Sequence, residues 1–143
     1  MALTPQEREE FLTEAHIGAL SVSAGPDRGP LTVPIWYDYT PGGEVWLLTG
    51  PTSKKMGLIK AAGRFSLMVE RVEPTVRYVT VEGPVTRIAE STDALHEAMV
   101  RRYLPPENVP GYLKFAVSLG EQSVVYMRPE HWLSADLGDT REL

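Results

Sequence analysis

The sequence of 143 residues contains no cysteine. This excludes disulfides, zinc sites built on thiolates and cysteine nucleophiles. Long apolar runs are also missing, because the longest fall far short of the roughly 20 residues that a membrane helix needs. The start, MALTPQEREEF, is acidic and polar and does not resemble a secretory signal peptide. These absences predict a cytoplasmic protein without a membrane partner.

Positive charge is scarce. Lysine and arginine number 14 against 19 acidic residues, which gives a formal net charge of −5 and a pI of about 5.2. A general nucleic-acid binder needs a basic surface, so we expect no nucleic-acid partner. Only four of the basic residues are lysines, and two of these, Lys54 and Lys55, are adjacent. A small, local anion-binding pocket remains compatible with this composition.

Motifs for several chemistries are absent. His16, His96 and His131 are far apart and form no HxxxH or HxH pattern, so surface or capping roles are expected rather than a metal site. There is no GxSxG elbow for a serine hydrolase. Neither a GxGxxG loop nor a P-loop occurs, so a phosphorylated cofactor would have to bind by another route.

The length suits one domain, 1–143, with residues 136–143 as a loose tail. A capping box at Thr4-Pro5-Gln6-Glu7 predicts a first helix to about Ala15. Helices and strands do not alternate regularly, which disfavours a parallel sheet and favours a mainly β fold: a small antiparallel barrel of six to seven strands with peripheral helices. We expect strands over 17–24, 31–39, 44–49, 64–72, 77–89 and 123–127, resuming near His131, and further helices over 53–62, 91–103 and 111–119.

Two prolines refine this pattern. Pro34 lies inside the strand expected over 31–39 and predicts an edge or bulged position, because proline cannot donate to a ladder. Gly83-Pro84 lies inside the longest expected strand and predicts a bulge or bend, as at a barrel corner.

The segment LLTGPTSKKMGLIK, residues 47–60, places hydroxyls and two cations where a strand becomes a helix. A helix N-terminus offers unpaired N–H groups and a positive dipole end. Thr52 or Ser53 can add a hydroxyl, and Lys54 or Lys55 a charge, but adjacent helical residues point about 100° apart and cannot both face one ligand. Two interpretations stay open: Ser53 as a helix cap beside solvated lysines, or an anion site. Cations in a first turn oppose the helix dipole, and a bound anion would resolve that mismatch.

The strand VPIWYDY, with VWLLT after it, carries aromatic and apolar side chains that suit a flat cofactor ring. Pro34 and Trp36 lie on one face of the first strand, and Thr49 ends the second. The alternative is that Trp36, Trp46 and the tyrosines are ordinary core or dimer-interface residues.

The segments IGALSV, LTVPIWYDY, GGEVWLLTG, TSKKMGLIK, GRFSLMVE and RYVTVEGPVTRI follow one another in an order that resembles the pyridoxamine-5′-phosphate-oxidase-like split β-barrel superfamily. The resemblance covers about residues 5–90 and is strongest to the actinobacterial F420-dependent reductase branch. Two departures argue against pyridoxamine phosphate oxidation. Lys55-Met56-Gly57-Leu58 lacks the asparagine common in FMN-binding relatives, and the C-terminal arginine motif for that substrate is not evident.

The resemblance implies an FMN-binding split-barrel fold and a homodimer with a cofactor, F420 or alternatively FMN, in grooves between the subunits. It implies a hydride transfer from the reduced deazaflavin to an unsaturated small molecule; an FMN-dependent oxidoreductase and a non-catalytic flavin or deazaflavin carrier are the alternatives. Catalytic residues are not assigned, and Tyr78, Tyr126 and His131 are equal candidates as proton donors. The implied cofactor-binding residues are Ser53, Lys54 and Lys55 for the phosphate, Val33, Pro34, Trp36, Leu48 and Thr49 for the ring, and Lys54, Lys60, Arg64 and Arg77 for the anionic tail of F420.

Overall fold

A computed structural model describes residues 1–139 and 141. In chain order, the elements are α1 (Pro5–Thr13), β1 (Gly18–Val22), β2 (Leu31–Ile35), β3 (Tyr37–Tyr39), β4 (Val45–Thr49), α2 (Lys54–Ala62), β5 (Arg64–Arg71), β6 (Val76–Glu90), α3 (Asp93–Tyr103), the 3₁₀ turn η1 (Pro106–Asn108), α4 (Val109–Val117), β7 (Ser123–Met127) and β8 (His131–Gly138).

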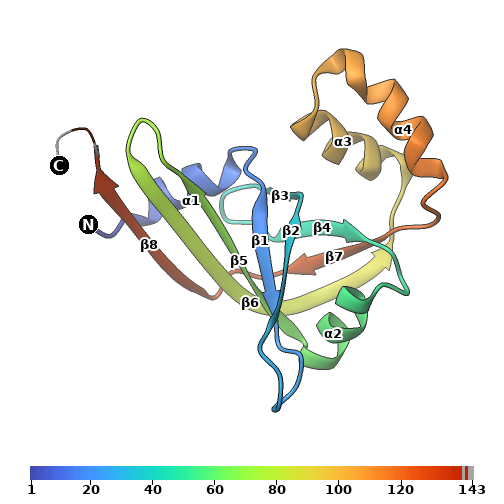
Figure 1. Ribbon diagram of the computed structural model, residues 1–143, viewed down its shortest axis with the longest axis horizontal. Coiled ribbons are helices and arrows are strands. Elements are labelled where there is room, and N and C mark those ends of the chain that lie inside the picture. The colour runs from blue at the N-terminus through green and yellow to red at the C-terminus, as the bar shows by residue number, and fades with distance from the viewer. Residues whose placement is uncertain (140, 142–143) are drawn as a thin grey trace.

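The strands form one curled antiparallel sheet (Figure 1). Its order is β2-β1-β5-β6-β7-β4-β3, and β8 pairs with β6. The expected mainly β, antiparallel fold is confirmed, with eight strands instead of six or seven. The end strands β2 and β3 follow each other in the chain, but no ladder joins them in the described residues, so the sheet is a half-barrel rather than a hydrogen-bonded closed barrel.

The extra strand arises at Trp36, which divides the segment expected over 31–39 into β2 and β3. Every second side chain still faces the core on both sides of this break, since Ile35, Tyr37 and Tyr39 are all buried. Tyr37 pairs with Leu47 of β4, and on the open edge of β3 its amide donates to the hydroxyl of Tyr103 on α3 (3.1 Å). Pro34 lies in an end strand of the sheet, as predicted.

The helix ends follow their capping residues. Thr4 and Glu7 form the predicted capping box of α1, which ends at Thr13, two residues earlier than expected. The side chain of Ser53 caps α2, and Gly63 ends that helix in the left-handed region at φ 73°, where glycine is favoured.

The long strand β6 joins the two halves of the sheet. Its first part pairs with β5 and β8, its last part pairs with β7, and the pairing register shifts between Val85 and Arg87. The bulge predicted near Gly83-Pro84 is therefore confirmed.

The loose tail expected over 136–143 is wrong for residues 136–138, which belong to β8. Asp136 anchors this end of the strand by accepting hydrogen bonds from Thr75 Oγ1 (2.7 Å), the Gly138 amide (2.8 Å) and Arg77 Nε (2.8 Å). These bonds lower the pKa of Asp136 to about 2, so it is ionised at neutral pH. Residues 140, 142 and 143 lie outside the described residues.

The hydrophobic core fills the inside of the curl. Phe11 and Leu12 of α1 and Met56 and Ile59 of α2 pack against the inward side chains of the strands. The paired helices α3 and α4 lie apart from this core, at one end of the molecule beyond β3 and β4 (Figure 1). Among the described residues, no helix is both long enough and apolar enough to cross a bilayer.

Candidate functional site

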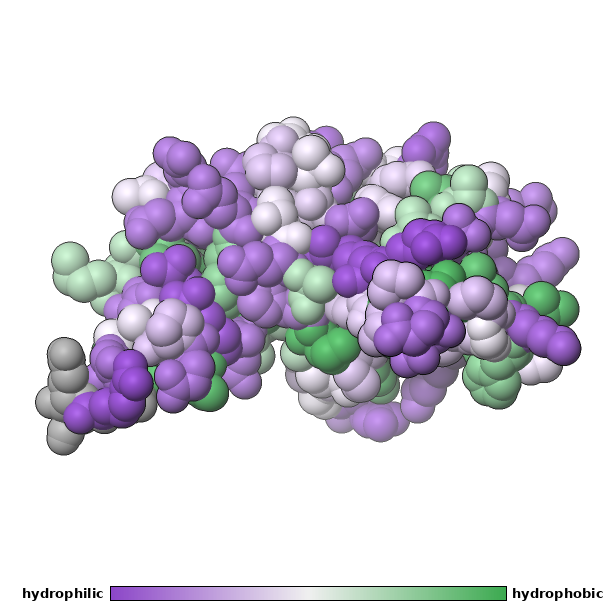
Figure 2. Space-filling view, turned by 90° about the horizontal axis from the view of Figure 1, so that it is seen from above, coloured by the Kyte–Doolittle hydropathy of each residue, from purple (hydrophilic) through white to green (hydrophobic). Residues whose placement is uncertain are grey.

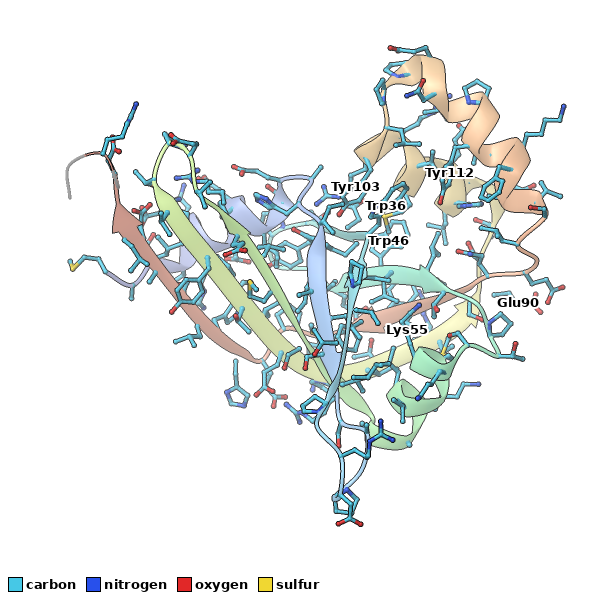
Figure 3. All side chains as sticks on the ribbon, viewed as in Figure 1. Trp36, Trp46, Lys55, Glu90, Tyr103 and Tyr112 are labelled. Atoms are coloured by element: carbon cyan, nitrogen blue, oxygen red, sulfur yellow. The ribbon has the colours of Figure 1, made fainter. Side chains whose placement is uncertain are left out.

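A cavity of about 260 Å³ lies between the α3–α4 pair and the strands β2 and β4. Pro34, Trp36 and Leu48, three of the residues expected to contact a ring, line it together. Trp36 stacks on Tyr103 with ring centroids 4.9 Å apart at 14°, and Tyr112 of α4 lies 5.5 Å from it at 31° (Figure 3). The cavity therefore offers the flat aromatic wall that a planar cofactor ring requires.

Two polar side chains, His96 and Gln122, also line this cavity. Within the described residues, neither makes a side-chain hydrogen bond. His96 lies one turn before Met99 and Val100, which are buried, so helical spacing places all three on the inner face of α3. That spacing was the available sequence signal for His96, whereas nothing in the sequence pointed to Tyr112.

The turn from β4 to α2 is organised by hydroxyl groups. Thr49, which is only 3% exposed, places its Oγ1 3.0 Å from Ser53 Oγ. Ser53 Oγ also accepts a hydrogen bond from the amide of Met56 (3.1 Å), which makes Ser53 the N-cap of α2. Since Leu48 lines the aromatic cavity and the next residue, Thr49, contacts the cap, β4 links the two parts of the site.

The two lysines of this turn differ in their surroundings. Lys54 is exposed, whereas Lys55 is half-buried. Burial lowers the pKa of the Lys55 ammonium, and no neighbouring charge within the described residues offsets this effect. In the part of the chain that the structure describes, this ammonium has no carboxylate partner, and it lies in the first turn of a helix, where the dipole is already positive. These residues fit the phosphate of a cofactor, because an anion would satisfy both the ammonium and the helix N-terminus.

The other predicted binding residues lie apart from this cavity. Val33 lines a neighbouring groove, which shares Ile17 and Pro34 with the aromatic cavity, and Lys60 is exposed in the last turn of α2. Arg64 is paired with Glu130 at 3.3 Å.

Arg77 is placed differently from the expectation. Asp136 holds its Nε at 2.8 Å, and its guanidinium lies 5.8 Å from the ring of Phe11, on the side of the sheet covered by α1. This arginine anchors β8 rather than contributing to the cavity.

None of the candidate proton donors lines the aromatic cavity. The guanidinium carbon of Arg87 lies over the ring of Tyr126, 4.2 Å from the ring centroid. His131 is exposed beside Glu130 (3.4 Å). Tyr78 pairs with Glu70 of β5 and Ala135 of β8, within the opposite half of the sheet.

Known proteins share this fold and sequence pattern. Residues 4–132 match the family model described as pyridoxamine 5′-phosphate oxidase. Among curated proteins, none matches the chain.

Three solved structures illustrate the similarity. An F420 reductase is 21% identical, with a TM-score of 0.69 and coverage of 87% of this chain and 94% of its own. The conserved hypothetical protein Rv2991 from Mycobacterium tuberculosis is 25% identical, with a TM-score of 0.71 and coverage of 95% and 86%. An FAD-binding protein (mll6688) from Mesorhizobium loti is 20% identical, with a TM-score of 0.60 and coverage of 95% of each chain. The two structures below 25% identity show the shared fold alone.

The family model spans nearly the whole described chain, including the strands β1 to β7, the capped turn at Ser53 and the aromatic cavity. The chain therefore belongs to the pyridoxamine 5′-phosphate oxidase family, on the split-barrel fold.

Proposed function

We propose that this protein is an F420-binding oxidoreductase that transfers a hydride from the reduced deazaflavin to an unsaturated small-molecule acceptor. The observation that carries the proposal is Lys55, a half-buried ammonium without a carboxylate partner in the described residues, at the start of α2. The family membership and the solved F420 reductase with the same fold support it.

Two groups of residues would hold the cofactor. Lys55, the hydroxyl of Ser53 and the first amides of α2 would bind the phosphate, while Pro34, Trp36 and Leu48 would contact the ring. The bound cofactor supplies the hydride. The chain binds and orients the cofactor, and its aromatic walls exclude water. Binding, orientation and exclusion of water are the main tasks of a protein in hydride transfer.

An FMN-dependent oxidoreductase is the second candidate, because the FAD-binding protein from Mesorhizobium loti has the same fold and a phosphate site suits either cofactor. Titrating the purified protein with F420 and with FMN separates them. We expect tighter binding of F420. Tight binding of FMN without binding of F420 would overturn the leading proposal, and tight binding without turnover of any acceptor would favour a carrier.

Replacing Lys55 by alanine is expected to weaken F420 binding about 10- to 150-fold, which corresponds to about 1.5–3 kcal/mol for a hydrogen bond to a charged group. Fluorescence titration measures this effect. Lys54→Ala is the matched control, since it removes the same charge from an exposed neighbour and should change the dissociation constant less than threefold. Equal affinities of the Lys55→Ala variant and the wild type would show that Lys55 does not bind the phosphate.

The affinity should also depend on pH through Lys55. Burial lowers its pKa in the free protein, and a bound phosphate would raise that pKa because it stabilises the ammonium. Binding therefore takes up protons near the lowered pKa, and affinity should fall as pH rises from neutral toward the ordinary lysine value of about 10.4. Lys55→Arg should flatten this profile, since arginine stays charged. A profile unchanged by Lys55→Arg would assign the pH dependence to another group.

We further propose that the protein is a homodimer with the cofactor grooves at the subunit interface. Figure 2 shows separate apolar patches on this face of the molecule, one of them at the end that carries α3 and α4. Large apolar side chains that are more than half exposed include Ile17 and Leu119 at the aromatic cavity, Phe115 and Val117 on α4, and Leu133 and Leu137 on β8. Surface of this kind is typical of interaction sites. Sedimentation velocity should give twice the chain mass of 15.9 kDa, and a monomer at micromolar concentration would contradict the proposal.

A further inference from the structure

A second, wider hollow of about 510 Å³ adjoins the aromatic cavity. It opens between the start of α3, the segment after α4 and the turn before α2, where it reaches Pro51. His96, Ala116 and Gln122 line both hollows, so the two form one continuous groove. The wider part alone falls within the 300–1,000 Å³ that is typical of small-molecule sites.

The wider part is acidic. Glu90, Asp93 and Glu121 line it, and no lysine or arginine does so among the described residues (Figure 3 labels Glu90). Among the described residues, none of these three carboxylates forms an ion pair. The side chains of His96 and Gln122, at the junction with the aromatic cavity, have free hydrogen-bonding capacity. The groove thus changes from aromatic walls near Trp36 to uncompensated negative charge.

We infer that this groove is the acceptor site and that it takes a planar conjugated molecule bearing a positively charged amine. The assignment of the groove as an acceptor site rests on the proposed function. The preference for a planar cation rests only on the residues that line the groove. The conjugated part would lie at the His96–Gln122 junction, beside the cavity proposed for the cofactor ring. The amine would lie near Glu90, Asp93 and Glu121, where an anionic molecule would be repelled.

Three naphthalene probes of nearly equal shape test the charge preference: 2-naphthylmethylammonium, 2-acetylnaphthalene and 2-naphthoate. Calorimetric titration of the full-length protein needs no cofactor. We expect the cation to bind at least about tenfold more tightly than the anion at low salt, since one unit charge at about 6 Å in water-like surroundings changes affinity about threefold. The difference should shrink as salt is added. Equal affinities, or tighter binding of the anion, would overturn the inference.

Variants locate the effect. Glu121→Lys should reduce the ratio of cation to anion affinity about threefold or more. Glu10→Lys makes the same change of net charge on α1, which lines neither hollow, and should leave the ratio unchanged. If both variants changed the ratio equally, the preference would come from the overall charge of the protein, and the inference about the groove would be overturned.

Hydrogen bonding at the junction gives a second readout. His96→Ala should weaken binding of the ketone 2-acetylnaphthalene about 2- to 12-fold, the range for one hydrogen bond. His131→Ala, at an exposed histidine outside the groove, should have no effect. Thermal unfolding of each variant shows whether it is folded. Unchanged ketone binding by a folded His96→Ala protein would remove His96 from the site.

Different results would overturn this inference and the proposed function. Charge-selective probe binding without any binding of F420 would overturn the cofactor proposal and leave the groove as a binding site. F420-dependent reduction of anionic acceptors as fast as that of cationic ones would overturn the groove and leave the proposed function intact.

Discussion

Replacing Arg102 by alanine is expected to lower the free energy of unfolding by about 3–5 kcal/mol, the cost of breaking a largely buried charged network. Its guanidinium donates to three backbone carbonyls, those of Tyr37 (2.7 Å), Thr13 (2.6 Å) and Glu14 (2.9 Å). It also lies 3.3 Å from a carboxylate oxygen of Asp38, and its side chain is only 14% exposed. Arg102 therefore joins α3 to β3 and to the end of α1.

Urea denaturation measures this loss, which is a large fraction of the 5–15 kcal/mol that stabilises a typical domain. Arg101→Ala is the matched control on the same helix. Its exposed pair with Glu97 spans one helical turn and is worth about 0.3–0.5 kcal/mol. Arg102→Lys should fall between the two, because it keeps the charge and loses the planar fork. A cost for Arg102→Ala within 1 kcal/mol of that for Arg101→Ala would show that the network does not hold α3.

The same network has a functional consequence. The hydroxyl of Tyr103, next in sequence, donates to the carbonyl of His16 (2.7 Å), and its ring stacks on Trp36. Loss of Arg102 should therefore loosen the aromatic wall of the cavity as well as the fold. Stability and ring binding are coupled in this region because neighbouring residues of one helix serve both.

Local patterns predicted most of the fold. The capping box at Thr4, the cap at Ser53, the stop at Gly63 and the bend near Gly83 each depend on residues close together in the sequence. The division of the strand at Trp36 could not be predicted in this way. The open edge of β3 is bonded to Tyr103, 66 residues beyond Tyr37, whose hydroxyl accepts from the Tyr37 amide.

The site was predictable where it is local and not where it is assembled by the fold. Pro34, Trp36 and Leu48 meet in one cavity, as expected from the strands that carry them. The placement of Arg77 could not be predicted, because charge alone does not show that a distant residue, Asp136, bonds to this arginine. The acidic groove was invisible in the sequence, since its carboxylates come from β6, from α3 and from the segment before β7.

Replacing Gly83 by alanine is expected to destabilise the fold by about 3 kcal/mol or more, at the upper end of the range for overpacking. A Cβ at this position would lie 1.8 Å from the carbonyl oxygen of Arg128 and 2.9 Å from its carbonyl carbon. Both are backbone atoms, so no side chain can rotate away. The Glu130 amide donates to Glu82 (2.8 Å) and the Arg128 amide donates to Pro84 (3.0 Å), which fixes the connection from β7 to β8 across Gly83.

Gly57→Ala provides a control of opposite sign for this prediction. Gly57 lies inside α2, where an added Cβ meets no atom within 4 Å. Alanine there should stabilise the protein by up to about 1 kcal/mol, because glycine is the poorer helix former. Urea denaturation of both variants compares them directly. If Gly83→Ala were as stable as the wild type, the β7–β8 connection would have to shift away from β6 at little cost. A close approach of the two backbones would then not be what requires glycine at the bend.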